Sequence, residues 1–433
     1  MSLSTKPLGG MRQRNPEEFR IEKYVTDMLR ECSHRAGFQE YDGPIMEPLA
    51  LFAAKSGREL IGRQSYSFTD RGGREVILRP EMTPSLARMV AGSGELRLPV
   101  RWFSMPLCYR YERPQRGRVR EFLQFNLDIL GTVELAAELE VMLVLQDIMD
   151  RLGAKRSIYR IGWSSRRFMT DAMGRLGFDE SVSAALFSAV DKRDKMKPEA
   201  WSAFILETCG NEEQAEKLIR LVTTESVKDE WLVSLMADSE PFQEVCRFQE
   251  LLDGAGAGSC VFSPGIVRGL DYYTGIVFEL TDTGGENRRA VCGGGRYDNL
   301  AALFGNKKIS GVGFGMGVLT MTLFLETYHL IPEKVRNSSL ADAFVAVVSR
   351  QELPEAASLV AELRSKGLRV IMDVSGRKMG RQFDEARRSG VPAVVIVGPE
   401  EVAGRFCTVK FLRDGTVTRS ALEDVDSLLE KLN

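Results

Sequence analysis

Residues 268 to 275 place an unusual amount of polar chemistry in one short stretch of the chain. An arginine, an aspartate and two tyrosines stand within eight residues, in the order Arg268-Gly269-Leu270-Asp271-Tyr272-Tyr273-Thr274-Gly275. The apolar residues that follow, from Ile276 to Phe278, are typical of a buried strand. Because polar groups are costly beside a buried strand, this combination points to a binding or catalytic site.

A second polar block lies upstream and is rich in arginine. It runs from Tyr109 to Gln124 and carries arginines at positions 110, 113, 116, 118 and 120. A guanidinium group donates two parallel hydrogen bonds and never loses its charge, which suits a phosphate group. The turn Pro114-Gln115-Arg116-Gly117 could therefore lie over a polyphosphate. Taken alone, the block fits a solvated charged hairpin or an RNA-contacting patch better.

Two weaker constellations accompany these blocks. In the run from Arg79 to Pro84, Glu81 and Thr83 follow a predicted strand and could hold an ammonium group, although the capped start of a helix is the commoner explanation. Two glycine-rich runs, 292–298 and 311–317, match neither the dinucleotide-binding nor the P-loop pattern. Their glycines would let a ligand approach the backbone, or would serve sheet packing.

The elements that position these residues follow from the apolar pattern. Residues 17–36 predict a helix, and residues 65–70, 73–78 and 100–111 predict strands. From Glu121 a strand alternates between an apolar face and a polar face that carries Gln124, Asn126 and Asp128. Because this polar face directly follows the arginine cluster, a polar pocket floor is as consistent with it as a half-exposed strand.

The chain divides by composition. Residues 155–257 have helical periodicity and predict a helical insertion between two strand-rich parts, 1–154 and 258–328. A linker at 329–340 precedes a domain at 340–433 that we predict to be a small, mostly parallel sheet with helices. Its predicted strands are 344–348, 368–374, 393–397 and 402–412, and its predicted helices are 354–366, 378–389 and 422–432.

Composition excludes several classes of protein. The seven cysteines form no C-x-x-C pair, and there are only two histidines, so neither a disulfide framework nor a metal centre is expected. No apolar run approaches the ~20 residues of a membrane span. The first residues lack a hydrophobic signal region, so we expect a cytoplasmic protein. The net charge of -2 gives no overall attraction to nucleic acid, so any such binding must come from local basic patches.

In this order, the blocks resemble class II aminoacyl-tRNA synthetases, and among them the histidyl-tRNA synthetase family. Arg268–Glu279 and Gly293–Asp298 are similar to the two histidine-specific signatures of that family, Tyr109–Gln124 to motif 2, and Pro44 to the dimer-interface proline of motif 1. The resemblance spans nearly the whole chain, least clearly the insertion. It implies an α+β fold: an antiparallel-sheet catalytic core (1–154 and 258–328) with the helical insertion, then an anticodon-binding α/β domain at 340–433.

The resemblance implies a histidine-binding site. Glu81 and Thr83 would hold the α-ammonium group with Gln124 nearby, while Asp128 and Tyr273 would contact the imidazole nitrogens. Asp128 stands where many bacterial members have glutamate, so its reach is shorter by one methylene. The implied histidine-binding residues are Glu81, Met82, Thr83, Arg110, Gln124, Asp128, Arg268, Tyr272 and Tyr273.

The implied reaction is activation of L-histidine with ATP, followed by transfer to the 3′ end of tRNA(His). Arg110 and Arg268 would be the catalytic residues at the α-phosphate, and Mg²⁺ would accompany the pyrophosphate oxygens. The implied ATP-binding residues are Arg110, Glu112, Arg118 and Arg120. Motif 3 of the family usually ends in an arginine that contacts the γ-phosphate, but Thr320 stands there. We hypothesise that Arg118 or Arg120 supplies the missing contact.

Two other functions compete with this interpretation. A histidine-sensing paralogue without ligase activity, such as an ATP phosphoribosyltransferase regulatory subunit, is favoured only by the missing arginine. A general RNA-binding module is disfavoured by the acidic charge balance. The resemblance also implies a homodimer, no membrane partner, and a tRNA-binding surface at Arg377, Lys378 and Arg381, for which a solvated helix face is an equally good explanation.

Overall fold

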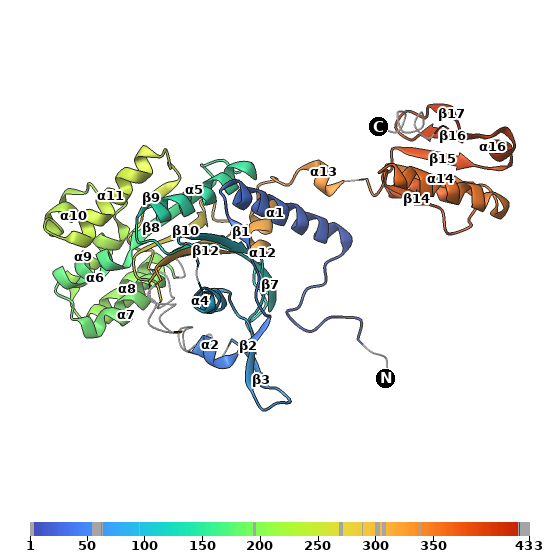
Figure 1. The fold of residues 1–433 in the computed structure, drawn as a ribbon. Helices are drawn as coiled ribbons and strands as arrows, with labels where there is room; N and C mark the ends of the chain where they lie inside the picture. The colour runs from blue at the N-terminus through green and yellow to red at the C-terminus, as the bar shows by residue number, and fades with distance from the viewer. Residues whose placement is uncertain are drawn as a thin grey trace. The chain divides into compact units, whose positions relative to one another are not determined.

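The computed structural model describes residues 4–53, 62, 64–94, 96–193, 196–267, 272–287, 289–298, 304, 309–337, 339–422 and 424. The chain forms two compact units, Met1–Ile331 and Pro332–Asn433, of which Figure 1 shows the elements. The boundary falls inside the predicted linker, which contains the short helix α13 (Glu333–Arg336). Arg268 and the predicted closing helix at 422–432 lie outside the described residues, apart from position 422 itself and Asp424.

Nine strands of the described residues form the main sheet of the first unit, in the order β1-β5-β7-β12-β11-β10-β8-β9 with β6 paired to β7. The edge pairs β1–β5 and β8–β9 are parallel and the other pairs are antiparallel. The strands are β1 (Gln39–Glu40), β5 (Val100–Ser104), β6 (Leu107–Tyr109), β7 (Glu121–Leu130), β8 (Tyr159–Ser165), β9 (Cys260–Phe262), β10 (Ile276–Asp282), β11 (Cys292–Tyr297) and β12 (Gly311–Gly317). The predicted strand 100–111 is divided because Pro106 cannot donate to the ladder.

Helices cover both faces of this sheet (Figure 1). On one face α1 (Pro16–Arg35) packs on α5 (Ala136–Arg151) and α12 (Val318–Thr327), which both contact β7 and β12. A capping box of Asn15 and Glu18 begins α1, and Gly37 follows its end with φ 76°, so the predicted helix 17–36 is confirmed to within one residue at each end. Against the other face, α4 (Thr83–Gly92) packs on the tyrosines of β11 and of the segment before β10.

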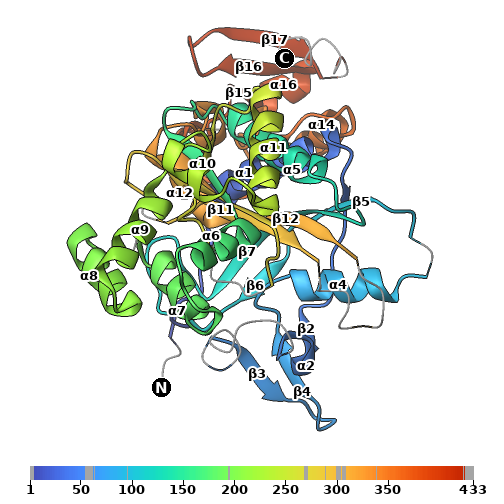
Figure 2. The same cartoon turned by 90° about the vertical axis from the view of Figure 1, so that its left-hand side faces the viewer.

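The helical module lies at the β8–β9 end of the sheet (Figure 1), and Figure 2 draws the molecule from the side of this module. Its helices are α6 (Arg166–Arg175), α7 (Glu180–Asp191), α8 (Pro198–Cys209), α9 (Glu212–Thr223), α10 (Glu230–Leu235) and α11 (Glu240–Gly254). The predicted boundary at 155 is wrong, because Tyr159–Ser165 forms β8 and pairs with β10 along its whole length. Six of the seven residues of β8 are buried, so the segment lacks the alternation that marks a half-exposed strand.

A smaller sheet in the first unit has the order β2-β4-β3. Its strands are β2 (Met46–Pro48), β3 (Tyr66–Thr69) and β4 (Glu75–Leu78), and α2 (Leu49–Ala53) follows β2. The Asp70 carboxylate accepts bonds from the backbone N–H groups of Gly72 and Arg74, and Gly73 has φ 78°. A tight turn at Gly72 and Gly73 therefore joins the antiparallel strands β3 and β4.

The second unit has a five-stranded sheet, counted over its described residues, in the order β14-β13-β15-β16-β17. The elements are β13 (Ala343–Val347), α14 (Leu353–Ser365), β14 (Val370–Met372), α15 (Met379–Arg388), β15 (Ala393–Val397), α16 (Pro399–Gly404), β16 (Phe406–Phe411) and β17 (Val417–Ala421). The sheet is only half parallel, since β16 and β17 pair antiparallel. Residues 402–404 of the predicted strand 402–412 belong instead to α16, the short helix that begins at Pro399. Strand β17 was not predicted.

Candidate active site

A cavity of about 980 Å³ brings most of the predicted site residues together in the first unit. It is lined by β7, β10, β11 and β12, by the first turns of α4 and α12, and by the end of α7. The predicted residues that line it are Glu81, Thr83, Arg110, Glu112, Arg118, Gln124, Asp128, Tyr272 and Tyr273. Segments that lie far apart in the sequence therefore meet in one place.

Glycines on β12 keep the floor of this cavity open. Each polar residue of β7 stands opposite a glycine: Gln124 opposite Gly317, Asn126 opposite Gly315 and Asp128 opposite Gly313. A Cβ atom at Gly313 would lie 2.1 Å from Asp128 Oδ1, and one at Gly315 would lie 2.3 Å from Gln124 Nε2. The second glycine-rich run therefore makes room for neighbouring polar side chains, which is more specific than either role considered from the sequence.

Two buried polar atoms on this floor have no hydrogen-bond partner among the described residues. They are Gln124 Oε1, an acceptor, and Asn126 Nδ2, a donor. Since buried polar groups are normally paired, two such atoms on adjacent positions of a cavity floor indicate that a polar ligand completes their bonding. The alternation from Glu121 predicted this floor, although Asn126 was not among the predicted site residues.

Asp128 is the most perturbed carboxyl group of the floor. The Tyr297 hydroxyl donates to Asp128 Oδ1 over 2.6 Å, and both side chains are buried. Burial raises the pKa of Asp128 to about 7, and the bond from Tyr297 opposes that rise. Tyr297, which belongs to the Gly293–Asp298 signature, was not predicted as a site residue. Burial therefore makes Asp128 a carboxyl group that can change charge near neutral pH.

A second group of polar side chains lies at the start of α4. Glu81 is buried, and the Tyr272 hydroxyl lies 3.5 Å from its Oε2 atom. Arg110 Nε donates to the Pro80 carbonyl oxygen over 2.9 Å, which holds the guanidinium group beside Glu81. The N-cap residue of α4 is Met82, whose side chain makes no capping bond, so neither Glu81 nor Thr83 occupies the capping position. A carboxylate and a guanidinium group side by side can hold a zwitterion by its two ends.

The turn between Arg110 and Arg120 forms another wall of the cavity. Gln115 and Arg118 pair through a backbone bridge, with Gly117 at φ 75° between them. Arg118 forms an ion pair with the buried Glu112. Arg289, on the connection between β10 and β11, also lines the cavity and was missed, because nothing in its local sequence marks it.

Two predicted site residues do not reach the cavity. Arg120 turns away from it: Nη1 donates to the Gly9 carbonyl oxygen, Nε donates to the Glu112 carbonyl oxygen, and the guanidinium group lies 4.0 Å from the Tyr111 ring centre. Met82 is fully buried beneath the start of α4, with Sδ 3.6 Å from Arg79 Nη1. Both predictions are therefore corrected. Arg268 lies outside the described residues.

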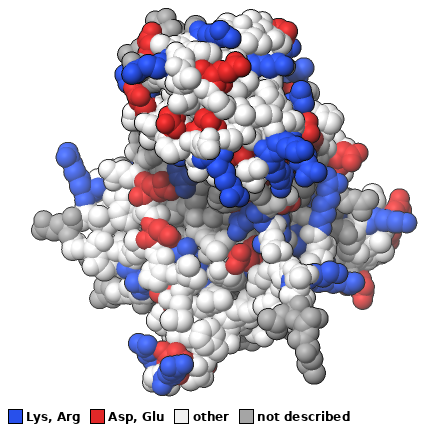
Figure 3. Space-filling view, turned by 90° about the vertical axis from the view of Figure 1, so that its right-hand side faces the viewer, with Lys and Arg blue, Asp and Glu red and all other residues white. Residues whose placement is uncertain are grey.

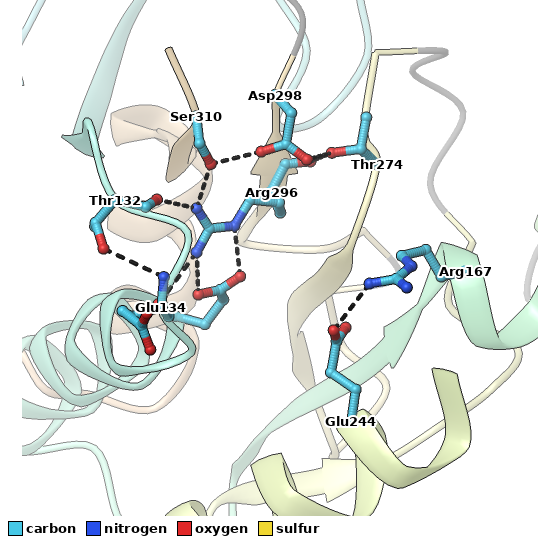
Figure 4. Close-up of polar contacts among 9 residues, drawn as sticks. Thr132, Glu134, Arg167, Glu244, Thr274, Arg296, Asp298 and Ser310 are labelled. Atoms are coloured by element: carbon cyan, nitrogen blue, oxygen red, sulfur yellow. Dashed lines mark hydrogen bonds and ion pairs between the residues drawn. The ribbon is translucent and has the colours of Figure 1, made fainter. Parts of the chain in front are cut away.

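A buried ion pair fixes the strand that carries Tyr297 (Figure 4). Arg296 and Glu138 are both buried and form two hydrogen bonds, of which Nε to Oε1 measures 2.7 Å. Arg296 Nη1 also donates to the Thr132 carbonyl oxygen and to Ser310 Oγ. Asp298 then accepts from Ser310 Oγ and from Thr274 Oγ1. The network thus joins β11 to α5 and to the segment that carries Tyr272 and Tyr273.

The second unit has a basic groove between α15 and β16, with a volume of about 670 Å³. The groove is lined by Lys378, Gly380, Arg381, Phe383, Asp384, Arg387 and Lys410. Four of these side chains are basic and one is acidic, so the groove attracts anions. Figure 3 shows lysine and arginine side chains adjoining one another on part of the face that it draws, with acidic side chains on the same face. Arg377 is exposed but does not line the groove.

Comparisons with known proteins agree with this arrangement. A model of the histidyl-tRNA synthetase family matches residues 10–321, and a model of the anticodon-binding domain matches residues 342–432. The chain is 32% identical to a histidine–tRNA ligase of Leptospira biflexa (100% of this chain, 99% of the relative) and 35% identical to one of Thermoplasma volcanium (99% of both). The crystal structure of histidyl-tRNA synthetase from Nostoc sp. PCC 7120 has the same fold, with a TM-score of 0.82 at 23% identity over 99% of this chain and all of that one.

The antiparallel sheet with its polar floor, together with the anticodon-binding domain, defines a class II aminoacyl-tRNA synthetase. Because the family model covers most of the chain and the relatives match it along their full length, the chain belongs to the histidyl-tRNA synthetase family. The predicted α+β fold class is confirmed.

We expect Glu138→Gln to destabilise the protein by about 3 kcal/mol, since it leaves the buried Arg296 without a counter-charge. The free energy of unfolding in urea would measure the change. Glu213→Gln is the matched control, because Glu213 pairs with Lys217 on the exposed face of α9, and the change should lower the free energy of unfolding far less. Equal losses in the two variants would contradict the role given to the Arg296 network.

We also expect Asp128→Asn to gain stability relative to the unmodified protein as the pH rises. The folded pKa of Asp128, about 7, lies above its usual value of 3.8. The folded state therefore binds more protons than the unfolded state in this window, and its stability falls as the carboxyl ionises. Asparagine cannot ionise, so the stability difference should grow by on the order of 3–4 kcal/mol from pH 4 to pH 8, at about 1.4 kcal/mol per pKa unit.

Urea unfolding of both proteins at several pH values would measure this difference. Asp414→Asn is the control of opposite sign, because the bond from the Thr416 backbone N–H lowers the pKa of Asp414. A stability difference for Asp128→Asn that stays constant across the pH range would show that Asp128 titrates normally.

Proposed function

We propose that this chain is a histidine–tRNA ligase, which activates L-histidine with ATP and transfers it to the 3′ end of tRNA(His). The observation that carries the proposal is the floor of β7, where Gln124, Asn126 and Asp128 face a cavity that glycines keep open. This floor suits a small polar amino acid, and it lies in a chain whose full-length relatives are named histidine–tRNA ligases.

In this proposal the two ends of histidine bind at two parts of the cavity. Glu81 and Thr83 hold the α-ammonium group, and Gln124 Oε1, which lacks a partner among the described residues, accepts one of its hydrogen bonds. Asp128 accepts from one imidazole N–H group, and Tyr273 contacts the other ring nitrogen. An isosteric side chain without those nitrogens would leave both groups unpaired, which is a strong basis for discrimination.

ATP lies along the arginine side of the cavity. Arg110 binds the α-phosphate, since Pro80 holds its guanidinium group beside the amino-acid site. A histidine carboxylate oxygen then bonds to the α-phosphorus as the bond to pyrophosphate breaks, and a ribose hydroxyl of the tRNA later displaces AMP. Positioning and cationic stabilisation of the phosphorus centre supply most of the rate. Arg268 keeps the same role as a prediction from the sequence.

Mg²⁺ would neutralise part of the charge of the triphosphate. The described residues contain no group of three metal-binding side chains. Mg²⁺ is usually held by one or two carboxylates and by substrate phosphates, so it needs no such group. Glu112 and Glu279 line the cavity and fit this role, although Glu112 already pairs with Arg118.

The basic groove of the second unit binds the anticodon arm of the tRNA. Lys378 and Arg381 line the groove, and Arg377 directly precedes Lys378. The groove also brings in Lys410 from β16, whose Nζ atom lies 5.5 Å from the Phe383 ring centre. Cations that contact phosphates, placed beside an aromatic ring that can stack on a base, are the usual means of binding single-stranded RNA.

We further propose that the chain is a homodimer. The small sheet and the segment that leads into it expose the large apolar side chains Ile45, Met46 and Phe68 beside the exposed Pro44. An exposed apolar group of this kind is typical of an interface.

Among the described residues, the helices are too short or too polar to span a membrane. A cytoplasmic location stays a prediction from the sequence.

The alternative function, a histidine-sensing paralogue, has less support. Relatives named histidine–tRNA ligase match both units of this chain end to end. A structure named as an ATP phosphoribosyltransferase regulatory subunit or histidyl-tRNA synthetase from Bacillus halodurans shares the fold, with a TM-score of 0.75, but at 21% identity this likeness speaks only to the fold.

The first test is exchange of labelled pyrophosphate into ATP without tRNA. We expect exchange that depends on histidine and on no other amino acid, because formation of the adenylate is reversible at the proposed site. Histidine binding by calorimetry without any exchange would instead favour the sensing paralogue.

Gly315→Ala should raise the KM for histidine at least tenfold, because the added Cβ atom displaces the Gln124 amide. The three atoms nearest to that Cβ atom all belong to the side chains of Gln124 and Asn126.

The matched control for this variant is Gly174→Ala in α6, where a Cβ atom has open space around it. The unfolding midpoints of both variants would show whether a raised KM comes from a lost contact or from a destabilised fold. An unchanged KM in a folded Gly315→Ala protein would remove Gln124 from the histidine site.

The tRNA proposal has its own test. The double change Lys378→Glu and Arg381→Glu should lower tRNA charging at least tenfold and leave pyrophosphate exchange intact, because it reverses charge only in the groove of the second unit. Arg413→Glu, an exposed change in the same unit outside the groove, is the control. Equal losses in charging and exchange would rule out a specific tRNA role for the groove.

A further inference from the structure

The cavity includes an arginine to which neither the sequence motifs nor the proposed reaction give a role. Arg289 lines the cavity from the connection between β10 and β11, and its Nη2 atom donates to Gln115 Oε1 over 2.8 Å. The two residues are 174 positions apart in the sequence. Arg289 therefore joins the turn at Gln115–Arg118, which forms the arginine-rich wall of the cavity.

The connection that carries Arg289 is anchored close to its start. Asp282, the last residue of β10, accepts from the Gly284 backbone N–H and from both the backbone and the side-chain nitrogen of Asn287. The Tyr328 hydroxyl, just after α12, donates to the same carboxylate. These contacts hold the start of the connection against the end of α12.

The charges of this wall do not balance. Arg118 and Arg289 are two cations, and Glu112 is the carboxylate that faces them. Arg118 pairs with Glu112, whereas the hydrogen-bond partner of Arg289 is a neutral amide, and no carboxylate of the described residues lies within 4.0 Å of its guanidinium group. Burial and then the Arg118 charge lower the pKa of Arg289. A surplus cation that faces a cavity is stabilised by an anionic ligand.

Position 320 faces the same turn but carries no charge. Thr320 lies in the first turn of α12 and lines the cavity. A Cβ atom at Gly117 would lie 4.0 Å from Thr320 Oγ1 and 3.6 Å from Leu323 Cδ1, so the turn packs on α12 at this place. The hydroxyl cannot neutralise a phosphate, while the guanidinium group that contacts Gln115 of the same turn can.

We propose that Arg289 binds the terminal phosphate of ATP and replaces the cation that position 320 lacks. This inference rests on the proposed function. Arg110 is held beside Glu81, at the amino-acid end of the cavity, so the α-phosphate lies there. The turn at Gln115–Arg118 is the far end of the same hairpin, and Arg289 stands where the triphosphate ends. Arg118 remains engaged with Glu112, and Arg120 turns away.

Calorimetry of Arg289→Ala with ATP and with AMP tests this assignment. We expect the Kd for ATP to rise at least tenfold and the Kd for AMP to stay within twofold, because AMP has no terminal phosphate. A merely structural role would weaken both ligands, and that result, or an unchanged Kd for ATP, would overturn the proposal. Arg151→Ala is the control, since Arg151 lies on α5 in a surface pair with Asp147.

Pyrophosphate exchange separates this proposal from the proposed function. We expect Arg289→Ala to raise the KM for ATP at least tenfold and to leave the KM for histidine within twofold. If the unmodified protein shows no histidine-dependent exchange, the proposed function fails, while the comparison of ATP with AMP still decides the role of Arg289. If the unmodified protein exchanges normally and Arg289→Ala keeps its KM for ATP, only the present proposal fails.

Discussion

The ion pair between Arg296 and Glu138 is the interaction on which the site depends. Removing two charges from water is expensive, and burial raises the pKa of Glu138 even with the guanidinium group beside it. The cost is offset because nearly every donor of Arg296 finds an acceptor on α5, on Ser310 or on the preceding backbone. The neighbouring residue, Tyr297, is thereby held against Asp128 from a fixed strand.

The same rigidity explains why the floor can hold a perturbed carboxyl group. Asp128 fits only because Gly313 has no Cβ atom. Gln124 and Asn126 also have glycines opposite them, which leave room for their polar side chains on the floor. A buried carboxyl group with a pKa of about 7 costs folding free energy near neutral pH. A ligand that donates a hydrogen bond to it recovers part of that cost, so burial of Asp128 favours binding of such a ligand.

Much of this arrangement could be predicted from local pattern. The alternation after Glu121 predicted a polar floor, because side chains of a strand alternate between faces whatever the tertiary context. The Asn15 capping box and Gly37 mark the ends of α1 for the same reason, since their effect is local. The missed strand β8 shows the limit, because a strand that is buried on both faces carries no alternating signal.

The errors at the site arise where distant segments decide the direction of a side chain. Arg118 and Arg120 stand two positions apart, yet Arg120 donates to the Gly9 carbonyl oxygen and lies over the Tyr111 ring. The local sequence does not place these groups beside Arg120. Arg289 is the converse case, because an anchored connection brings it to the turn at Gln115. A phosphate responds to the position of a charge and not to its place in a motif. An ATP site can therefore be intact without an arginine at position 320 of α12 when the connection between two other strands places a cation in the same part of the cavity.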